Sequence, residues 1–171
     1  MGQENQKWDK IETYFFNFHQ QLIGLRELAR IIKISKTTLK RYLQLMVKKK
    51  LIKMQGNNYI ANSSYFWYQF NKKDRLLREI YESGLVGFIQ THTQANTIIL
   101  FGSGSKGEYV KESDLDIFVF AREKALNLTV FEKGLKRKIN LLFKDNYDKL
   151  SSELFNNIIN GYKLSGYIKI K

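Results

Sequence analysis

Two aspartates, Asp114 and Asp116, follow the pair Gly102–Ser103 at a spacing of ten intervening residues. An apolar run, Thr97 to Phe101, precedes the glycine, and a second run, Leu115 to Phe120, contains the second aspartate. Side chains alternate along a strand, so we expect both carboxylates on one face. Carboxylates held this close repel each other unless a cation lies between them, and Mg²⁺ prefers such oxygen ligands. The pair therefore predicts a divalent metal site.

The Gly102–Ser103 pair ends the first apolar run abruptly, which indicates a tight turn. Glycine lets the backbone approach a ligand closely, and free N–H groups at the start of a helix bind anions. Magnesium ions in proteins usually keep phosphate as a further ligand. The turn and the aspartates together predict a metal-bound phosphate. The alternative is a plain turn followed by two exposed aspartates at a strand edge.

This combination resembles the signature of the DNA polymerase beta nucleotidyltransferase superfamily. It is most similar to the minimal nucleotidyltransferases, specifically the prokaryotic proteins that carry a winged helix in front of that domain. The resemblance implies that Gly102, Ser103 and Lys106 bind a nucleoside triphosphate, with ATP the expected one. It implies that Asp114 and Asp116 are the catalytic ligands of Mg²⁺ or Mn²⁺.

The implied activity is metal-dependent transfer of a nucleoside monophosphate from the triphosphate to a protein or RNA hydroxyl. Minimal relatives often work beside a helical, toxin-like partner protein in toxin–antitoxin pairs. For this chain that partner is implied by the resemblance alone.

One position departs from the family pattern. Active members carry a third carboxylate on a later strand, and the matching strand here, Lys138 to Phe143, has Asn140 at that position. An amide can bind a metal through its oxygen, but it cannot act as a base near neutral pH. Asp145 and Asp148 lie just beyond the strand and could substitute. Catalysis is therefore left open, and the alternative function is a non-catalytic, nucleotide-sensing transcriptional regulator.

Positive charge is concentrated in the first third of the chain. Residues 1–62 contain twelve Lys/Arg and four Asp/Glu, whereas the whole chain has a formal net charge of +13. Such an excess is typical of a module that binds nucleic acid. A solvated lysine-rich face would have the same composition.

The apolar pattern of that third predicts a helix-turn-helix. Helices are expected at Asp9 to Gln20, at Leu25 to Ile32 and from the N-cap Ser35 to about Lys49. The third helix has a polar, basic outer face, and the turn-rich stretch Gln55 to Asn58 predicts a hairpin that would form a wing. The predicted contacts to double-stranded DNA are Lys36, Thr37, Lys40, Arg41, Gln44 and Lys53. The alternative is a unit that packs against a neighbour or dimerises; winged helices often pair on palindromic sites, which leaves a homodimer open.

The predicted fold is α+β, with a winged helix-turn-helix at residues 1–62, a helical connector at 63–93 and a small mixed-sheet nucleotidyltransferase domain at 94–171. Five aromatic residues near the start of the connector are expected to pack between elements, although such a cluster can also stack on single-stranded bases. These residues are Tyr65, Phe66, Trp67, Tyr68 and Phe70. The basic triplet Lys136 to Lys138 could neutralise a bound triphosphate or form a solvated turn.

Several classes are excluded or disfavoured by composition. No apolar run approaches the roughly 20 residues that span a bilayer, and the polar N-terminus predicts no signal peptide. The absence of cysteine excludes disulfides and thiolate metal sites and fits a cytoplasmic protein.

Overall fold

The computed structural model describes residues 3–168, and the chain divides into two compact units, Met1–Lys72 and Lys73–Lys171. The boundary between the units falls within helix α4 (Phe66–Glu82). Each unit has its own hydrophobic core. The finer division of the chain at residues 62 and 93 stays a prediction.

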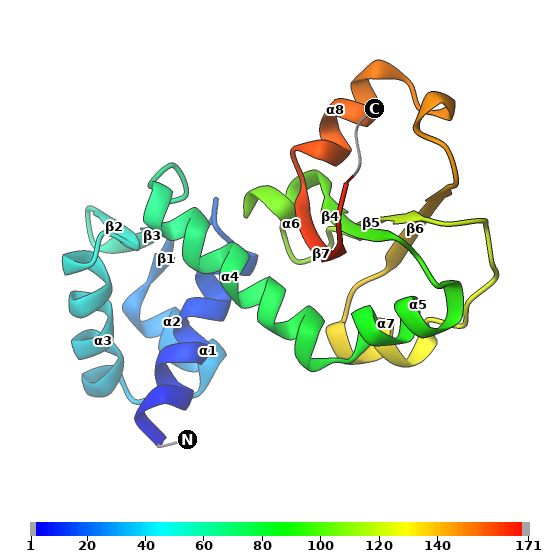
Figure 1. Ribbon diagram of the computed structural model, residues 1–171. Coiled ribbons are helices and arrows are strands. Elements are labelled where there is room, and N and C mark those ends of the chain that lie inside the picture. The colour runs from blue at the N-terminus through cyan, green and yellow to red at the C-terminus, as the bar shows by residue number, and fades with distance from the viewer. Residues whose placement is uncertain (1–2, 169–171) are drawn as a thin grey trace. The chain divides into compact units, whose positions relative to one another are not determined.

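The first unit combines helices with a small antiparallel sheet (Figure 1). Its elements before α4 are α1 (Gln3–Asn17), β1 (Ile23–Gly24), α2 (Leu25–Ile32), α3 (Lys36–Lys48), β2 (Ile52–Gln55) and β3 (Asn58–Ala61). The sheet order is β1-β3-β2, so the expected hairpin is present and gains a third, two-residue strand. Gly56 allows its tight turn, with φ at +59°.

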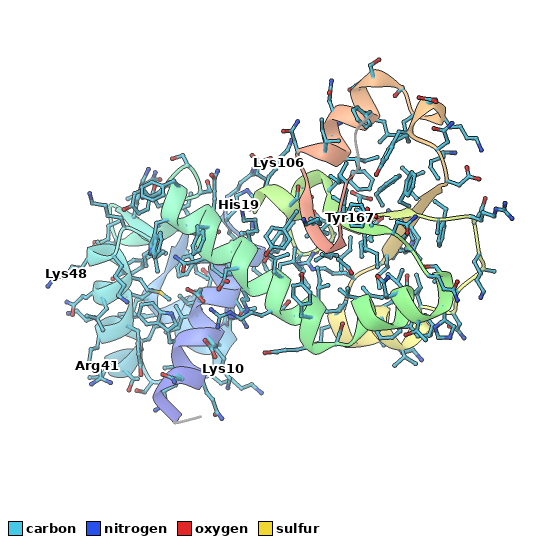
Figure 2. All side chains as sticks on the ribbon, in the orientation of Figure 1. Lys10, His19, Arg41, Lys48, Lys106 and Tyr167 are labelled. Atoms are coloured by element: carbon cyan, nitrogen blue, oxygen red, sulfur yellow. The ribbon has the colours of Figure 1, made fainter. Side chains whose placement is uncertain are left out.

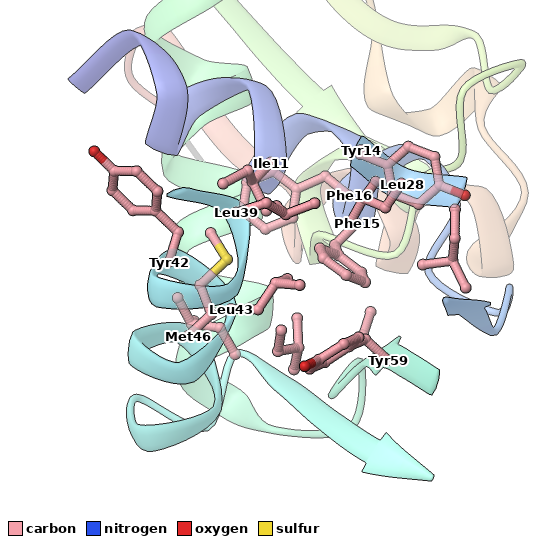
Figure 3. Close-up of a cluster of buried hydrophobic side chains, with 14 of the residues drawn as sticks. Ile11, Tyr14, Phe15, Phe16, Leu28, Leu39, Tyr42, Leu43, Met46 and Tyr59 are labelled. Atoms are coloured by element: carbon pink, nitrogen blue, oxygen red, sulfur yellow. The ribbon is translucent and has the colours of Figure 1, made fainter. Parts of the chain in front are cut away.

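One side of α3 packs into the core of the first unit. Leu39, Leu43 and Met46 are almost fully buried, and Figure 3 shows these side chains in the cluster that also contains the α1 residue Phe15. The hydroxyl oxygen of Ser35 accepts a hydrogen bond from the backbone N–H of Thr38 at 3.4 Å, as its predicted N-cap role requires. Helix α1 begins earlier than expected and ends at Asn17, three residues before the predicted end.

The prediction that the connector aromatics are packed inside is wrong for three of the five. Tyr68 is buried, and its hydroxyl group donates a hydrogen bond to the carbonyl oxygen of Phe15 at 2.8 Å. In contrast, Phe66, Trp67 and Phe70 are exposed, and the Trp67 and Phe70 rings stack with centroids 5.0 Å apart. These positions fall on the side of α4 that the local core does not cover, because a helix directs only part of its surface inward.

The second unit is built on a four-stranded mixed sheet. Its elements after α4 are α5 (Leu85–Thr93), β4 (Thr97–Phe101), α6 (Gly102–Lys106), β5 (Leu115–Phe120), α7 (Thr129–Leu135), β6 (Ile139–Lys144), the 3₁₀ helix η1 (Tyr147–Lys149), α8 (Ser152–Ile159) and β7 (Tyr162–Gly166). The sheet order is β6-β5-β4-β7, in which β5 and β6 are parallel and the other pairs are antiparallel. The mixed sheet expected for this part of the chain is confirmed, and β7 forms one of its edges.

Both faces of this sheet are covered. Ile117 and Val119 of β5 pack into the same cluster as Leu76 of α4 and Ile89 of α5, whereas Phe118 packs with Ile158 of α8. The alternation along β5 therefore places Asp116 on the same face as Phe118, the face that α8 covers. Within residues 3–168, no helix is long and apolar enough to cross a membrane.

Candidate active site

The two aspartates converge with Asn140 at one end of the sheet. In the parallel pairing of β5 with β6, Asp116 is the register partner of Asn140. The Asn140 side-chain amide donates hydrogen bonds to Asp116 Oδ1 at 3.1 Å and to Asp114 Oδ2 at 3.3 Å. Both carboxylates therefore lie on the same side of the strand, as their spacing predicts. Asp114 and Asp116 are half-buried and Asn140 is exposed, so the group opens to solvent.

Gly102 lies directly beside this group because β4 and β5 are neighbours. Phe101, the last residue of β4, is the register partner of Asp116, and Gly102 follows it with φ at +67°. A Cβ atom at this position would lie 2.8 Å from Asp116 Oδ2, too close for any other residue without a shift. Glycine is therefore required twice, by backbone conformation and by the carboxylate next to it.

The predicted phosphate-binding turn forms the short helix α6. Ser103 is half-buried in its first turn, and the first amides of a helix have no partner within the helix. The hydroxyl group of Ser105 donates to the carbonyl oxygen of Gly102 at 2.8 Å and so stabilises the turn. Lys106 is exposed and lies in the last turn of α6 (Figure 2). Gly102 and Ser103 are thus next to the carboxylates, and Lys106 is three to four residues further along the helix.

The proposal that Asp145 or Asp148 supplies a third acid is wrong. Asp145 follows the opposite end of β6, five residues beyond Asn140, which is about 16 Å along a strand. Its carboxylate accepts a hydrogen bond from Lys149 Nζ at 2.7 Å, and this bond together with the charge of Lys149 lowers the pKa of Asp145. Among the described residues, no group of three or more His, Cys, Asp and Glu side chains is placed to hold a metal ion. The position where the resemblance predicts a third carboxylate is therefore occupied by the Asn140 amide.

The donor set nevertheless suits a hard divalent cation. Two carboxylates and one amide oxygen are ligands that Mg²⁺ and Mn²⁺ accept. A half-turn of the Asn140 amide would present Oδ1 in place of Nδ2 toward the carboxylates and any cation between them. The site would then have two negative charges, which a single divalent ion neutralises. The glycine beside Asp116 leaves the space that a larger residue would fill.

Sequence reasoning missed how Arg137 is used. Its Nη1 atom donates to the carbonyl oxygens of Val110, Ser113 and Lys111 at 2.7, 3.0 and 3.2 Å, and its guanidinium carbon lies 4.6 Å from the centre of the Tyr109 ring. The basic triplet was expected either to neutralise a bound triphosphate or to form a solvated turn; its central member, Arg137, donates to backbone carbonyl oxygens. Backbone carbonyl acceptors leave no pattern in the sequence, so no signal could have identified this contact.

The predicted DNA contacts lie on the surface of the first unit. All five on α3 are exposed, and so is Lys53 on β2. Figure 2 shows Arg41 and Lys48 projecting outward from α3. The Arg41 guanidinium lies 5.3 Å from the centre of the Tyr42 ring, next to a surface hollow of about 320 Å³ between α1 and α3. Residues 1–72 contain thirteen Lys/Arg and four Asp/Glu, so this surface belongs to a strongly basic unit.

The comparison with protein families addresses the second unit. Residues 83–164 match the family model for polymerase beta nucleotidyltransferases. This match supports the superfamily that the Gly-Ser and Asp-x-Asp pattern indicated. It contains the whole candidate site, from Gly102 to Asn140, and begins after the first unit ends. No curated protein and no solved structure matches the chain.

Proposed function

We propose that the second unit is a nucleotidyltransferase-type domain that binds a nucleoside triphosphate with a divalent metal ion and transfers its nucleoside monophosphate to a hydroxyl group. The observation that carries this proposal is the convergence of Asp114, Asp116 and Asn140 beside Gly102. Nucleotidyl transfer at the family level is supported by the match over residues 83–164. The base of the nucleotide, with ATP as the working choice, and the acceptor, protein or RNA, are part of the proposal.

Each residue would have a distinct task in this mechanism. Asp114 and Asp116 would hold the cation, Gly102 would leave room for the phosphate chain, and the first amides of α6 would donate hydrogen bonds to phosphate oxygens. A bound divalent ion would polarise the α-phosphate and stabilise the charge of the leaving group. The acceptor oxygen forms a bond to the α-phosphorus while the bond to the β-phosphate oxygen breaks and pyrophosphate leaves.

The proton of the acceptor hydroxyl group cannot go to Asn140, because an amide is no base near neutral pH. It passes to solvent or to the phosphate chain. The amide at position 140, in place of a carboxylate base, favours a second candidate function. In this alternative the site binds nucleotide without turning it over, and the protein is a nucleotide-sensing transcriptional regulator.

Labelled nucleoside triphosphates separate the two candidates. The protein is incubated with Mg²⁺ and labelled triphosphate in the presence of candidate protein and RNA acceptors, and label on the acceptor is measured. If the protein is an enzyme, label is expected on an acceptor with the wild type and is expected to be absent with Asp114→Ala. Binding of the nucleotide without label on any acceptor contradicts the enzyme and favours the sensor.

We also propose that the first unit is a winged helix-turn-helix that binds double-stranded DNA. The supporting observations are three helices followed by the β2–β3 hairpin, the exposed basic face of α3 and the charge of the unit. The variant Lys40→Ala/Arg41→Ala is expected to bind duplex DNA more weakly, whereas Lys7→Ala/Lys10→Ala, on α1, serves as the control for the same loss of two charges. Equal weakening by both variants would remove the α3 face from the interface.

A further inference from the structure

Arg137 lies in the turn between α7 and β6 and reaches across to the loop that leads into β5. This loop, residues 109–113, connects α6 to the first aspartate of the site. The guanidinium group is half-buried, and its Nη1 atom donates to three backbone carbonyl oxygens of the loop, those of residues 110, 111 and 113. The Arg137 side chain thus donates hydrogen bonds to three of the five backbone carbonyl oxygens of this loop.

The loop itself is closed around these carbonyls. The backbone N–H of Val110 donates to Ser113 Oγ at 2.9 Å, and the backbone N–H of Ser113 donates to the carbonyl oxygen of Val110 at 3.1 Å. The ring of Tyr109, only 4% exposed, lies 4.6 Å from the guanidinium carbon of Arg137. Arg137 is therefore packed against the loop on an aromatic face as well as bonded to it.

The consequence concerns Asp114. The carbonyl oxygen of Ser113 belongs to the peptide unit directly before Asp114, and Arg137 holds it at 3.0 Å. On the other side, the backbone N–H of Leu115 donates to the carbonyl oxygen of Lys138 at 2.8 Å. The backbone is thus held on both sides of Asp114. The Arg137 side chain binds the residue before it, and the main chain of Lys138 binds the residue after it.

We propose that Arg137 is a positioning residue for the metal–nucleotide site: it holds the 109–113 loop so that the Asp114 carboxylate faces Asp116 and Asn140. This inference rests on the proposed function of the same site. It assigns to Arg137 no contact with metal or nucleotide. Replacing a residue that orients a metal ligand without touching the metal typically lowers metal affinity about 10- to 100-fold.

The direction of the change in Mn²⁺ affinity distinguishes a positioning role of Arg137 from a purely electrostatic one. Arg137→Gln removes a positive charge near a cation site, so a purely electrostatic role predicts tighter Mn²⁺ binding in this variant. The positioning role predicts the opposite, a Kd for Mn²⁺ raised about tenfold. Arg137→Lys keeps the charge but cannot reproduce the planar contacts to several carbonyls. We expect it to weaken Mn²⁺ binding as well.

The experiment measures Mn²⁺ binding by electron paramagnetic resonance in the full chain, without nucleotide, for the wild type, Arg137→Gln and Arg137→Lys. Arg122→Gln is the matched control, because Arg122 is exposed just beyond the opposite end of β5. Weaker binding in both Arg137 variants and unchanged binding in the control supports positioning. Unchanged or tighter binding in Arg137→Gln overturns it.

Amide hydrogen exchange makes the test independent of the proposed function. The N–H groups of Val110, Ser113 and Leu115 are hydrogen-bonded, and Arg137→Gln is expected to accelerate their exchange at least tenfold relative to the strands β4 and β5. Unchanged exchange overturns the positioning role even if the wild type binds no Mn²⁺. If the wild type binds no Mn²⁺ but the loop amides exchange faster in Arg137→Gln, the proposed function is contradicted and the role of Arg137 in holding the loop is supported.

Discussion

Replacing Asn140 by aspartate tests whether this residue lies at the proposed metal site. The Asn140 amide nitrogen lies 3.1 and 3.3 Å from oxygens of Asp116 and Asp114, so Asn140→Asp places a third negative charge next to two others. In the absence of metal the variant loses two hydrogen bonds and gains two repulsions. A divalent ion in the site would reverse the balance.

The magnitude follows from the exposure of Asn140. Two unit charges about 4 Å apart interact by about 1 kcal/mol in water, so two new repulsions cost about 2 kcal/mol of folding free energy without metal. A divalent cation at a similar distance attracts the new carboxylate by about 2 kcal/mol, which corresponds to a roughly 30-fold lower Kd. We therefore expect a less stable metal-free protein that binds Mn²⁺ more tightly.

Two measurements check these signs. Thermal unfolding with a chelator gives the metal-free stability, and Mn²⁺ titration followed by electron paramagnetic resonance gives the Kd. Asn146→Asp is the matched control: it adds the same charge beyond the opposite end of β6, where Asn146 Oδ1 accepts a hydrogen bond that an aspartate can also accept. If both variants behave alike in both measurements, Asn140 does not lie at the metal site and the reasoning is refuted.

The remaining predictions address the turn at Gly102, the hairpin and the half-buried His19 of the first unit. Gly102→Ala is expected to weaken Mn²⁺ binding at least tenfold, because its Cβ would enter the carboxylate beside it, whereas Gly87→Ala, where a Cβ meets open space, should leave the Kd unchanged. Lys53→Ala should weaken duplex binding alike on every sequence and reduce the salt slope by about 1 in an anisotropy titration; an unchanged slope would exclude a phosphate contact. Burial, with a smaller contribution from the charge of a neighbouring lysine, lowers the pKa of His19 below its ordinary value of 6.5. Because the unfolded chain then binds the proton more readily, the unfolding free energy should fall as pH drops through about 6.5, and urea titrations of His19→Gln should show a smaller fall.

The parts of the site that the sequence predicted are those set by local rules. Strand alternation placed Asp114 and Asp116 on one side of the chain, and the end of an apolar run placed Gly102 at the end of β4. The strand that contains Asn140 was identified through the resemblance to the nucleotidyltransferase superfamily, and its parallel pairing with β5 places Asn140 beside Asp116. The predictions for the aspartates and Gly102 depend only on residues that are close in sequence.

The features that escaped prediction depend on contacts between distant residues. Strand β1 has two residues, and only its pairing with β3, Ile23 with Tyr59, defines it. The density of aromatic residues around Trp67 did not reveal which rings face the core of their unit. Arg137 binds carbonyls 24 to 27 residues earlier in the chain, and the main chain is the same for every residue type.

The central claim is that the carboxylates of Asp114 and Asp116 and the Gly102 turn together bind a metal-bridged polyphosphate. Isothermal titration calorimetry with a non-hydrolysable ATP analogue in the presence of Mn²⁺ tests it most directly. The wild type is expected to bind one equivalent, with binding lost on addition of a chelator and in Asp114→Ala. No heat of binding in the folded wild type, or equal binding in Asp114→Ala, would contradict the claim.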